Sequence, residues 1–186
     1  MHFIYIYYFI FRVHVRTLSI ANRVTVLNLG LNDKSDAVTM MVKDKLIPAW
    51  INAMEGSIFN LLRGIDVEGC SDIAVQVLQV WLKTLNYKEI TSQLPIGEEN
   101  LVSVEALTPE VALYWCTAVG FLRSEGVHAA DALETIMPEM TAFGKYLKEF
   151  VLARLKESDD MQQVKDTSFY KIVAFRSKKA IYVYRR

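Results

Sequence analysis

The sequence predicts an all-α fold built from stacked antiparallel helix pairs. Between about residues 20 and 157, apolar residues recur at spacings of three and four, which places them on one face of a helix. Short breaks containing Gly, Pro, Asn or Asp separate these runs, and no convincing strand pattern interrupts them. The pattern gives about seven helices of roughly 9–17 residues each.

The first two helices are expected on either side of residue 33. Apolar positions within 24–31 share a face, and the pattern breaks at Asn32. Ser35 or Asp36 can cap the following helix by accepting backbone N–H bonds. Pro48 marks a boundary or kink in that helix, because proline has no N–H to donate to the preceding turn.

Glycine and polar residues also mark the next two helices. Gly56 interrupts the pattern, and a short apolar stripe follows over residues 58–65. The next helix starts at Ser71 or Asp72 and presents a broad apolar face over residues 73–85.

The main internal loop is predicted over residues 90–100, which read ITSQLPIGEEN. A sharply capped helix follows it. Thr108 is the expected N-cap, Pro109 occupies the first helical position, and Glu110 complements the helix dipole. Gly126 ends this helix.

Two more helices are expected over residues 129–137 and 139–155, separated by Pro138. Antiparallel pairs of about 40–47 residues have the period of HEAT-type repeats. About 140 residues then hold about three repeats, and such a repeat buries its apolar face only against its neighbours. The sequence therefore predicts a segment of a longer HEAT-type α-solenoid.

The two ends differ from this block, which divides the chain into residues 1–19, 20–157 and 158–186. Residues 1–11 are apolar except for His2, too short for a membrane span of about 20 residues, and no positive region precedes them as in a signal peptide. The preferred interpretation is a segment not native to the domain; a buried element and a membrane anchor are the alternatives. From Phe169 onward the tail alternates apolar and basic residues like a strand.

Charge is unevenly distributed along the chain although the net charge is zero. Residues 1–19 carry two basic and no acidic residues, residues 20–157 carry 12 basic and 18 acidic, and residues 158–186 carry 7 basic and 3 acidic. The central block is therefore not a generic basic nucleic-acid-binding domain. With two cysteines there is no disulfide framework, and a reducing compartment is expected.

No catalytic or cofactor pattern stands out. Cys116 and His128 have the residue types of a thiol nucleophile and its base, but a packed structural cysteine is the preferred interpretation. No CxxC or HxxxH spacing indicates a metal site, and no Gly-rich loop precedes a GK[ST] triplet. The acidic pairs at 98–99 and 159–160 are interpreted as solvated loop residues. We therefore expect no enzyme activity, cofactor, metal or small-molecule substrate.

Four separated blocks resemble one protein family. They are RVTVLNLGLNDKSDAV (23–38), AWINAMEGSIFNLLRGIDVEGCSDIAVQVL (49–78), VEALTPEVALYWC (104–116) and ALETIMPEMTAFGKYL (132–147). In this order and spacing they are similar to the HEAT-repeat G subunit of eukaryotic condensin, also called condensin subunit 3. The resemblance covers about residues 20–155, and neither end of the chain matches the family.

The resemblance implies a non-catalytic subunit of the condensin complex. In that family the subunit binds the kleisin chain, which links it to two coiled-coil ATPases, and the two together hold double-stranded DNA without sequence specificity. Chromosome condensation and segregation in mitosis, and a location in the nucleus and on chromosomes or in the cytoplasm outside mitosis, follow as expectations.

Candidate surface and core residues complete the prediction. The candidate DNA or partner surface consists of Lys43, Lys45, Arg63, Lys145 and Lys148, for which a solvated face is the alternative. The expected structural core includes Trp50, Trp81, Trp115 and Cys116. Two other function classes stay open. One is a HEAT-like adaptor that binds peptides without DNA, which the acidic central block favours, and the other is a membrane-associated helical protein anchored by residues 1–11.

Overall fold

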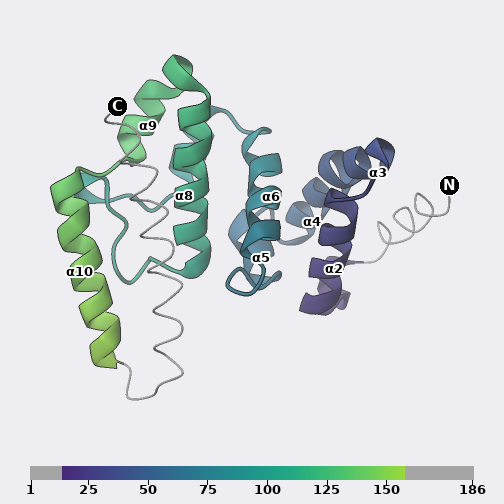
Figure 1. The fold of residues 1–186 in the computed structure, drawn as a ribbon, viewed down its shortest axis with the longest axis horizontal. Coiled ribbons are helices and arrows are strands. Elements are labelled where there is room, and N and C mark those ends of the chain that lie inside the picture. Colours follow the sequence, from purple (N-terminus) through teal and green to yellow (C-terminus); the bar gives the residue numbers. More distant parts are fainter. Residues whose placement is uncertain (1–13, 158–186) are drawn as a thin grey trace. The chain divides into compact units, whose positions relative to one another are not determined.

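The computed structural model describes residues 14–157 and divides into two compact units, with the boundary between Thr84 and Leu85 (Figure 1). The named elements of the described residues are helical, apart from a single isolated bridge between Ile96 and Val102. The prediction of an all-α fold is confirmed. Expectations for residues 1–13 and 158–186 lie outside the described residues.

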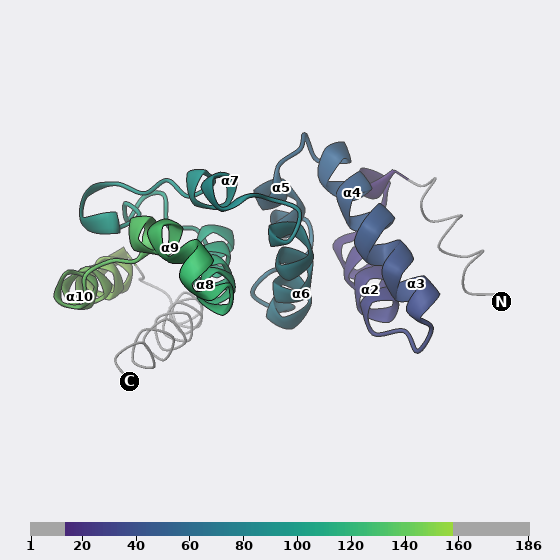
Figure 2. The same cartoon turned by 90° about the horizontal axis from the view of Figure 1, so that it is seen from above.

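The first unit consists of two antiparallel helix pairs behind a short N-terminal turn. Its elements are the 3₁₀ turn η1 (Val15–Thr17), α2 (Ile20–Leu31), α3 (Asp36–Met41), the π-helical turn η2 (Val42–Leu46), α4 (Ile47–Ala53), α5 (Ile58–Arg63) and α6 (Ser71–Leu82). Helix α2 packs against α3 and α6, and α4 packs against α5 and α6 (Figure 2). Buried aliphatic side chains from all of these helices fill the interior between them.

Helix α2 begins where the N-terminal turn ends. The Ser19 hydroxyl accepts a hydrogen bond from the backbone N–H of Asn22, which satisfies a donor that the first helical turn leaves without a partner. Val15, in the turn before it, is only 1% exposed. The described structure of this unit therefore starts before residue 20, whereas the domain boundary placed there from the sequence stays a prediction.

Helices α3 and α4 continue one another through the π-helical turn, which ends two residues before Pro48. In a regular helix the proline ring would collide with the carbonyl of Asp44, four residues earlier. A π turn adds one residue to the helical turn and is a common form of helix irregularity. The irregularity expected at Pro48 is thus confirmed, and its form is a wide turn, not a helix end.

The second unit contains two long helices and several shorter helical elements. Its elements are α7 (Tyr87–Ser92), the 3₁₀ turn η3 (Glu98–Asn100), α8 (Pro109–Ser124), the 3₁₀ turn η4 (Gly126–Ala129), α9 (Ala130–Ile136) and α10 (Met140–Glu157). Helix α7 packs against both α8 and α9 (Figure 2).

The predicted loop over residues 90–100 is wrong at its start, because α7 continues through Ser92. Asn86 and Glu89 form a reciprocal capping box, in which each side chain accepts a hydrogen bond from the backbone of the other. This box nucleates a helix of only six residues, whose buried contact to the core is made by Ile90. A short helix with one buried side chain leaves little periodicity in the sequence.

Helix α8 starts as predicted at Pro109, with the Thr108 hydroxyl accepting from the N–H of Val111 at 3.4 Å. Two adjacent aromatic residues in its middle reach different neighbours. The buried Tyr114 hydroxyl donates to the carbonyl of Ile90 in α7 at 3.0 Å, and the Trp115 indole N–H donates to that of Ile136 in α9 at 2.7 Å. Because successive helical residues point about 100° apart, the adjacent Tyr114 and Trp115 can each hydrogen-bond to a different helix.

The side chain of Asn100 also donates hydrogen bonds to carbonyl groups at the end of α9. Asn100 lies in the left-handed region at φ 56°, and its amide donates to the carbonyls of Glu134 at 2.8 Å and Met137 at 3.2 Å. The last carbonyls of a helix have no partner within the helix, so Asn100 and Trp115 together supply donors that α9 lacks. On its other side the Trp115 ring meets the edge of Phe143 from α10, with centroids 6.0 Å apart.

Candidate partner-binding surface

Lys43 and Lys45 lie in the π-helical turn of the first unit, and both are exposed. Asp44, between them, is exposed as well, so the turn presents two cations and one carboxylate to solvent. The neighbouring Val42 and Leu46 are buried and hold the turn against the core. The turn can contact an anionic surface through the two lysines, although the local charge is only +1.

Lys145 and Lys148 are exposed on α10 of the second unit and lie three residues apart, on one face of the helix as predicted. The second unit as a whole is acidic in composition. Residues 85–157 contain 6 basic and 11 acidic residues, whereas residues 14–84 contain 7 of each. By composition the second unit would therefore repel a polyanion overall, whereas the first unit, with equal numbers of basic and acidic residues, would not.

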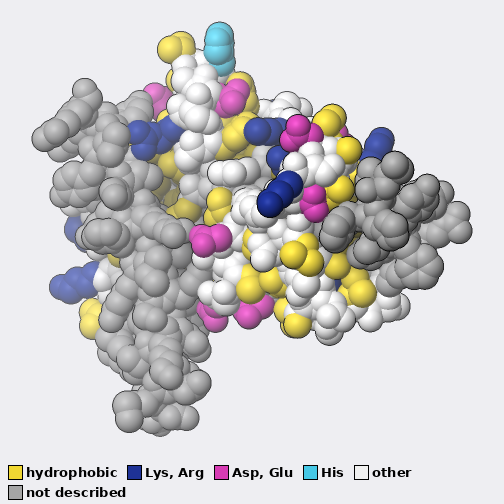
Figure 3. Space-filling view, turned by 45° about the vertical axis from the view of Figure 1, so that its right-hand side comes forward, with side chains coloured by type: hydrophobic (Ala, Val, Ile, Leu, Met, Phe, Trp, Pro, Cys, Tyr) yellow, Lys and Arg dark blue, Asp and Glu magenta, His cyan; other side chains and the backbone are white. Residues whose placement is uncertain are grey.

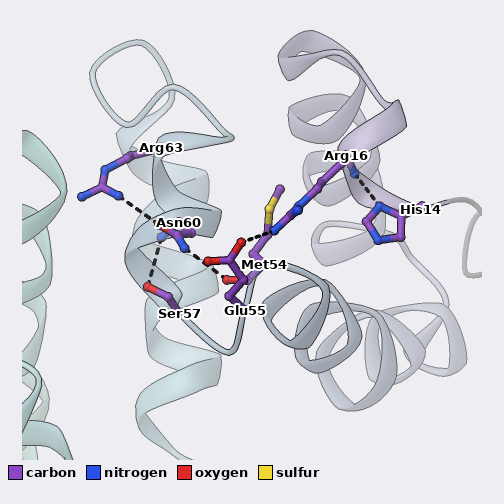
Figure 4. A network of polar contacts seen from close by, with 7 residues as sticks. All are labelled: His14, Arg16, Met54, Glu55, Ser57, Asn60 and Arg63. Carbon is purple, nitrogen blue, oxygen red and sulfur yellow. Dashed lines mark hydrogen bonds and ion pairs between the residues drawn. The ribbon is translucent and has the colours of Figure 1, made fainter.

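Arg63 is part of a chain of polar contacts in the first unit (Figure 4). Its guanidinium donates to the Asn60 side-chain oxygen at 2.9 Å, and the Asn60 amide donates to the carbonyl of Met54 at 3.3 Å. The next residue, Glu55, forms an ion pair of 2.7 Å with Arg16. The Arg16 backbone N–H in turn donates to the Nδ1 atom of His14.

Arg23 joins this region from α2. Its Nε atom donates to the carbonyl of Val15 at 2.9 Å, and its Nη1 atom donates to the carbonyl of Gly64 at 3.0 Å. Through these two bonds Arg23 connects α2 to the N-terminal turn and to Gly64, which lies 41 residues later in the chain. The sequence analysis missed both arginines as site residues, and no periodicity within one helix indicates such a contact between separate elements.

The surface of the first unit is mixed in charge and polarity. Figure 3 shows basic and acidic side chains interspersed with hydrophobic and other surface on the coloured part of the face in view. Large hydrophobic side chains that are exposed include Leu29 at 62% and Met40 at 59%. The coloured side chains in this view therefore form local cationic groups and not a continuous basic face.

The expected core residues divide into two groups. Trp50 and Trp115 are buried, at 3% and 7% exposure, whereas Trp81 and Cys116 are half-buried. The indole nitrogens of Trp50 and Trp81 are buried without a hydrogen-bond partner, in contrast to that of Trp115. Buried indole N–H groups usually have a partner, so the first unit tolerates an uncommon arrangement.

The residue types considered for catalysis are separated in the structure. Cys116 lies in the middle of α8, and His128 is exposed in the 3₁₀ turn η4. Within residues 14–157, no three His, Cys, Asp or Glu side chains are grouped so that they could hold a metal ion. Nor does any helix in this range have the length and apolar character needed to cross a bilayer.

Three curated relatives are similar to the chain, and each is named condensin complex subunit 3. The protein from Homo sapiens is 39% identical over 141 residues, which is 75% of this chain, and the one from Xenopus laevis is 36% identical over 160 residues, or 83%. The protein from Schizosaccharomyces pombe is 38% identical over 64 residues, 34% of this chain. This chain belongs to the condensin subunit 3 family.

The chain covers 14% of the human condensin subunit 3 and 16% of the frog protein. No family model matches it. Family membership together with the helical architecture confirms the predicted HEAT-type class. The assignment of individual surface residues to partners stays a prediction.

Proposed function

We propose that this chain is part of a non-catalytic HEAT-repeat subunit of condensin that binds the kleisin chain and, with it, double-stranded DNA. In this role it contributes to the condensation and segregation of chromosomes in mitosis, in the nucleus and on chromosomes. The observation that carries the proposal is the identity of 36–39% with two proteins named condensin complex subunit 3, over 75–83% of this chain.

The helical architecture supports a scaffold role. Buried side chains, such as Tyr114 and Trp115, hydrogen-bond to neighbouring helices, which restricts the movement of one helix against the next. A rigid surface loses little conformational entropy on binding, which favours affinity for an extended partner. Contacts to DNA would be made through backbone phosphates and would weaken as salt concentration rises.

The test is affinity purification of the full-length endogenous product from dividing cells, with mass spectrometry of the proteins that accompany it. Stoichiometric recovery of the coiled-coil ATPases and the kleisin is the expected result. Their absence, with other proteins recovered in their place, would reject the condensin role and leave only the helical scaffold.

A second candidate is a HEAT-like adaptor that binds peptides and not DNA. The excess of acidic residues in the second unit favours it, because a negative surface repels DNA and attracts basic segments. Measuring the salt dependence of DNA binding by the full-length product separates the two. A strong decrease of affinity with salt supports the first candidate, and no measurable binding at low salt supports the second.

A further inference from the structure

Ser19 follows Arg16 by three residues in the segment RTLSI, which spans residues 16–20. No other serine or threonine in the sequence has an arginine at this distance before it. Kinases that select a serine by this arginine hold the guanidinium in an acidic pocket, and they place an apolar residue directly after the serine against an apolar surface. Ile20 occupies that position. The segment therefore has the spacing and residue types of a substrate for this class of kinase.

The structure exposes the side chains that such a kinase must contact. Arg16 and Ser19 are exposed, and Ile20 is 48% exposed although it is apolar. The backbone is extended at Leu18, with φ −81° and ψ 141°, and at Ser19, with φ −65° and ψ 158°. Protein kinases bind their substrates in an extended form. The acceptor hydroxyl thus lies on an exposed and already extended stretch of the chain.

The interactions that hold Arg16 in place are weak enough to open locally. It belongs to a 3₁₀ turn of only three residues, and such turns have poorer hydrogen-bond geometry than an α-helix. Its ion pair with Glu55 is 2.7 Å long, but the two side chains are 51% and 72% exposed (Figure 4). Exposed pairs contribute little to stability. Val15, only 1% exposed, anchors the chain just before the segment, so the opening stays local.

Thr91 provides a comparison within the same chain. Lys88 lies three residues before it, so a cation stands at the same distance from a hydroxyl. Both residues, however, lie inside α7, and the Thr91 hydroxyl donates to the carbonyl of Lys88 at 3.1 Å. The helix would have to unwind before this residue could extend into a kinase cleft. The structure therefore presents Ser19 to such a kinase and withholds Thr91.

We propose that Ser19 is a phosphorylation site for an arginine-directed serine kinase, a role that does not depend on the proposed condensin function. The kinase uses ATP as its second substrate. The Ser19 oxygen attacks the γ-phosphorus and forms a new O–P bond, while the bond from this phosphorus to the β–γ bridging oxygen breaks and ADP leaves. The hydroxyl proton passes to the catalytic aspartate of the kinase. The product carries a charge of about −1.5 to −2 at neutral pH.

A phosphate on Ser19 would act on helix α2. The Ser19 hydroxyl accepts from the N–H of Asn22 at 3.2 Å, and the first turn of α2 contains no acidic residue. Negative charge at the start of a helix is favourable, because the helix dipole and the unpaired N–H groups point toward it. We expect amide exchange in the first turn of α2 to slow by about two- to fivefold after phosphorylation. The modification would therefore stabilise the start of α2.

The experiment incubates the folded full-length product with ATP and calmodulin-dependent protein kinase II, which selects serine by this arginine spacing. Mass spectrometry of the tryptic peptide of residues 17–23 then locates the phosphate. We expect phosphate on Ser19, and a reaction about tenfold slower in Arg16→Gln because one charge-assisted contact to the kinase is lost. A proline-directed kinase should leave this peptide unmodified.

Arg63→Gln is the matched control, because it removes the same charge from an exposed residue of the same unit outside the segment. Its rate, and that of Thr17→Ala, should equal the parent's, with folding checked by circular dichroism. The endogenous product from cells treated with a phosphatase inhibitor should carry phosphate on Ser19. An unmodified Ser19 in either preparation, phosphate on Thr17 in its place, modification only after heat denaturation, or an unchanged rate in Arg16→Gln would each overturn the proposal.

Discussion

Within each of the two units, the helices are connected by a different kind of polar interaction. In the second unit, buried side chains donate to backbone carbonyls of neighbouring helices, as Tyr114 and Trp115 do. In the first unit, the corresponding indole of Trp50 has no partner, and the links between elements are made by arginines at the surface. Buried hydrogen bonds fix helix positions, whereas surface arginines remain accessible to other anions.

The largest expected effect distinguishes the two buried tryptophans. Trp115→Phe leaves the carbonyl of Ile136 without its donor and opens space beside Phe143, so we expect a loss of about 2–4 kcal/mol in stability of the second unit. Trp50→Phe removes no hydrogen bond and should cost the first unit about 1–2 kcal/mol. Hydrogen exchange of backbone amides in α9 and α4 reports the two losses separately. Equal losses would contradict the comparison.

Alanine substitutions at two glycines should give the next largest effects on stability, with opposite signs. Gly64→Ala places a Cβ 2.8 Å from Arg23 Nη1 and 3.1 Å from the carbonyl of Leu61, and it should destabilise the first unit by about 1–3 kcal/mol. Gly120→Ala, in the middle of α8, meets no atom within 4 Å and should stabilise the second unit by about 1 kcal/mol, because alanine is the better helix former. Urea unfolding followed by amide exchange measures both.

These effects show why the sequence predicts the helices better than the contacts between them. The start of α8 at Pro109 was readable because capping chemistry is local in the chain. Helix α7 was placed in a loop because six residues with one buried side chain carry almost no periodicity. The partners of Tyr114 and Trp115 lie 24 and 21 residues away, and spacing within α8 contains no information about them.

The candidate surface residues show the same difference between features that local sequence predicts and contacts that depend on packing. Exposure of Lys43 and Lys45 agrees with what a polar position in a helix suggests. The meeting of Arg23 with the neighbours of Arg16 and Arg63 depends on packing between α2, the N-terminal turn and α5. The spacing of residues within one helix does not predict these contacts.

The hydroxyl of Tyr114 is expected to make a smaller contribution to stability, and this contribution depends on pH. Burial raises the pKa of its hydroxyl, so the folded state keeps the proton at a pH where the unfolded chain, with a pKa of about 10, loses it. Its contribution is therefore fully present below about pH 10, and the stability of the second unit falls as pH rises above that value. Tyr114→Phe should cost about 1–2 kcal/mol at neutral pH through the lost bond to Ile90.

Tyr114→Phe should also reduce the loss of stability of the second unit above about pH 10. The control is Tyr87→Phe, because Tyr87 also has a raised pKa, caused first by its hydrogen bond to Glu125. Tyr87 is only half-buried, and its removal should leave most of the alkaline loss in place. Thermal unfolding across the alkaline range measures this, and an unchanged alkaline loss in Tyr114→Phe would show that burial of this hydroxyl is not its source.

The smallest effect concerns the ion pair between Arg16 and Glu55. A double-mutant cycle with Arg16→Gln and Glu55→Gln should give a coupling of at most about 1 kcal/mol, because both side chains are largely exposed. High salt should abolish it. A coupling well above that limit would mean that the folded structure holds the pair in one geometry despite its exposure.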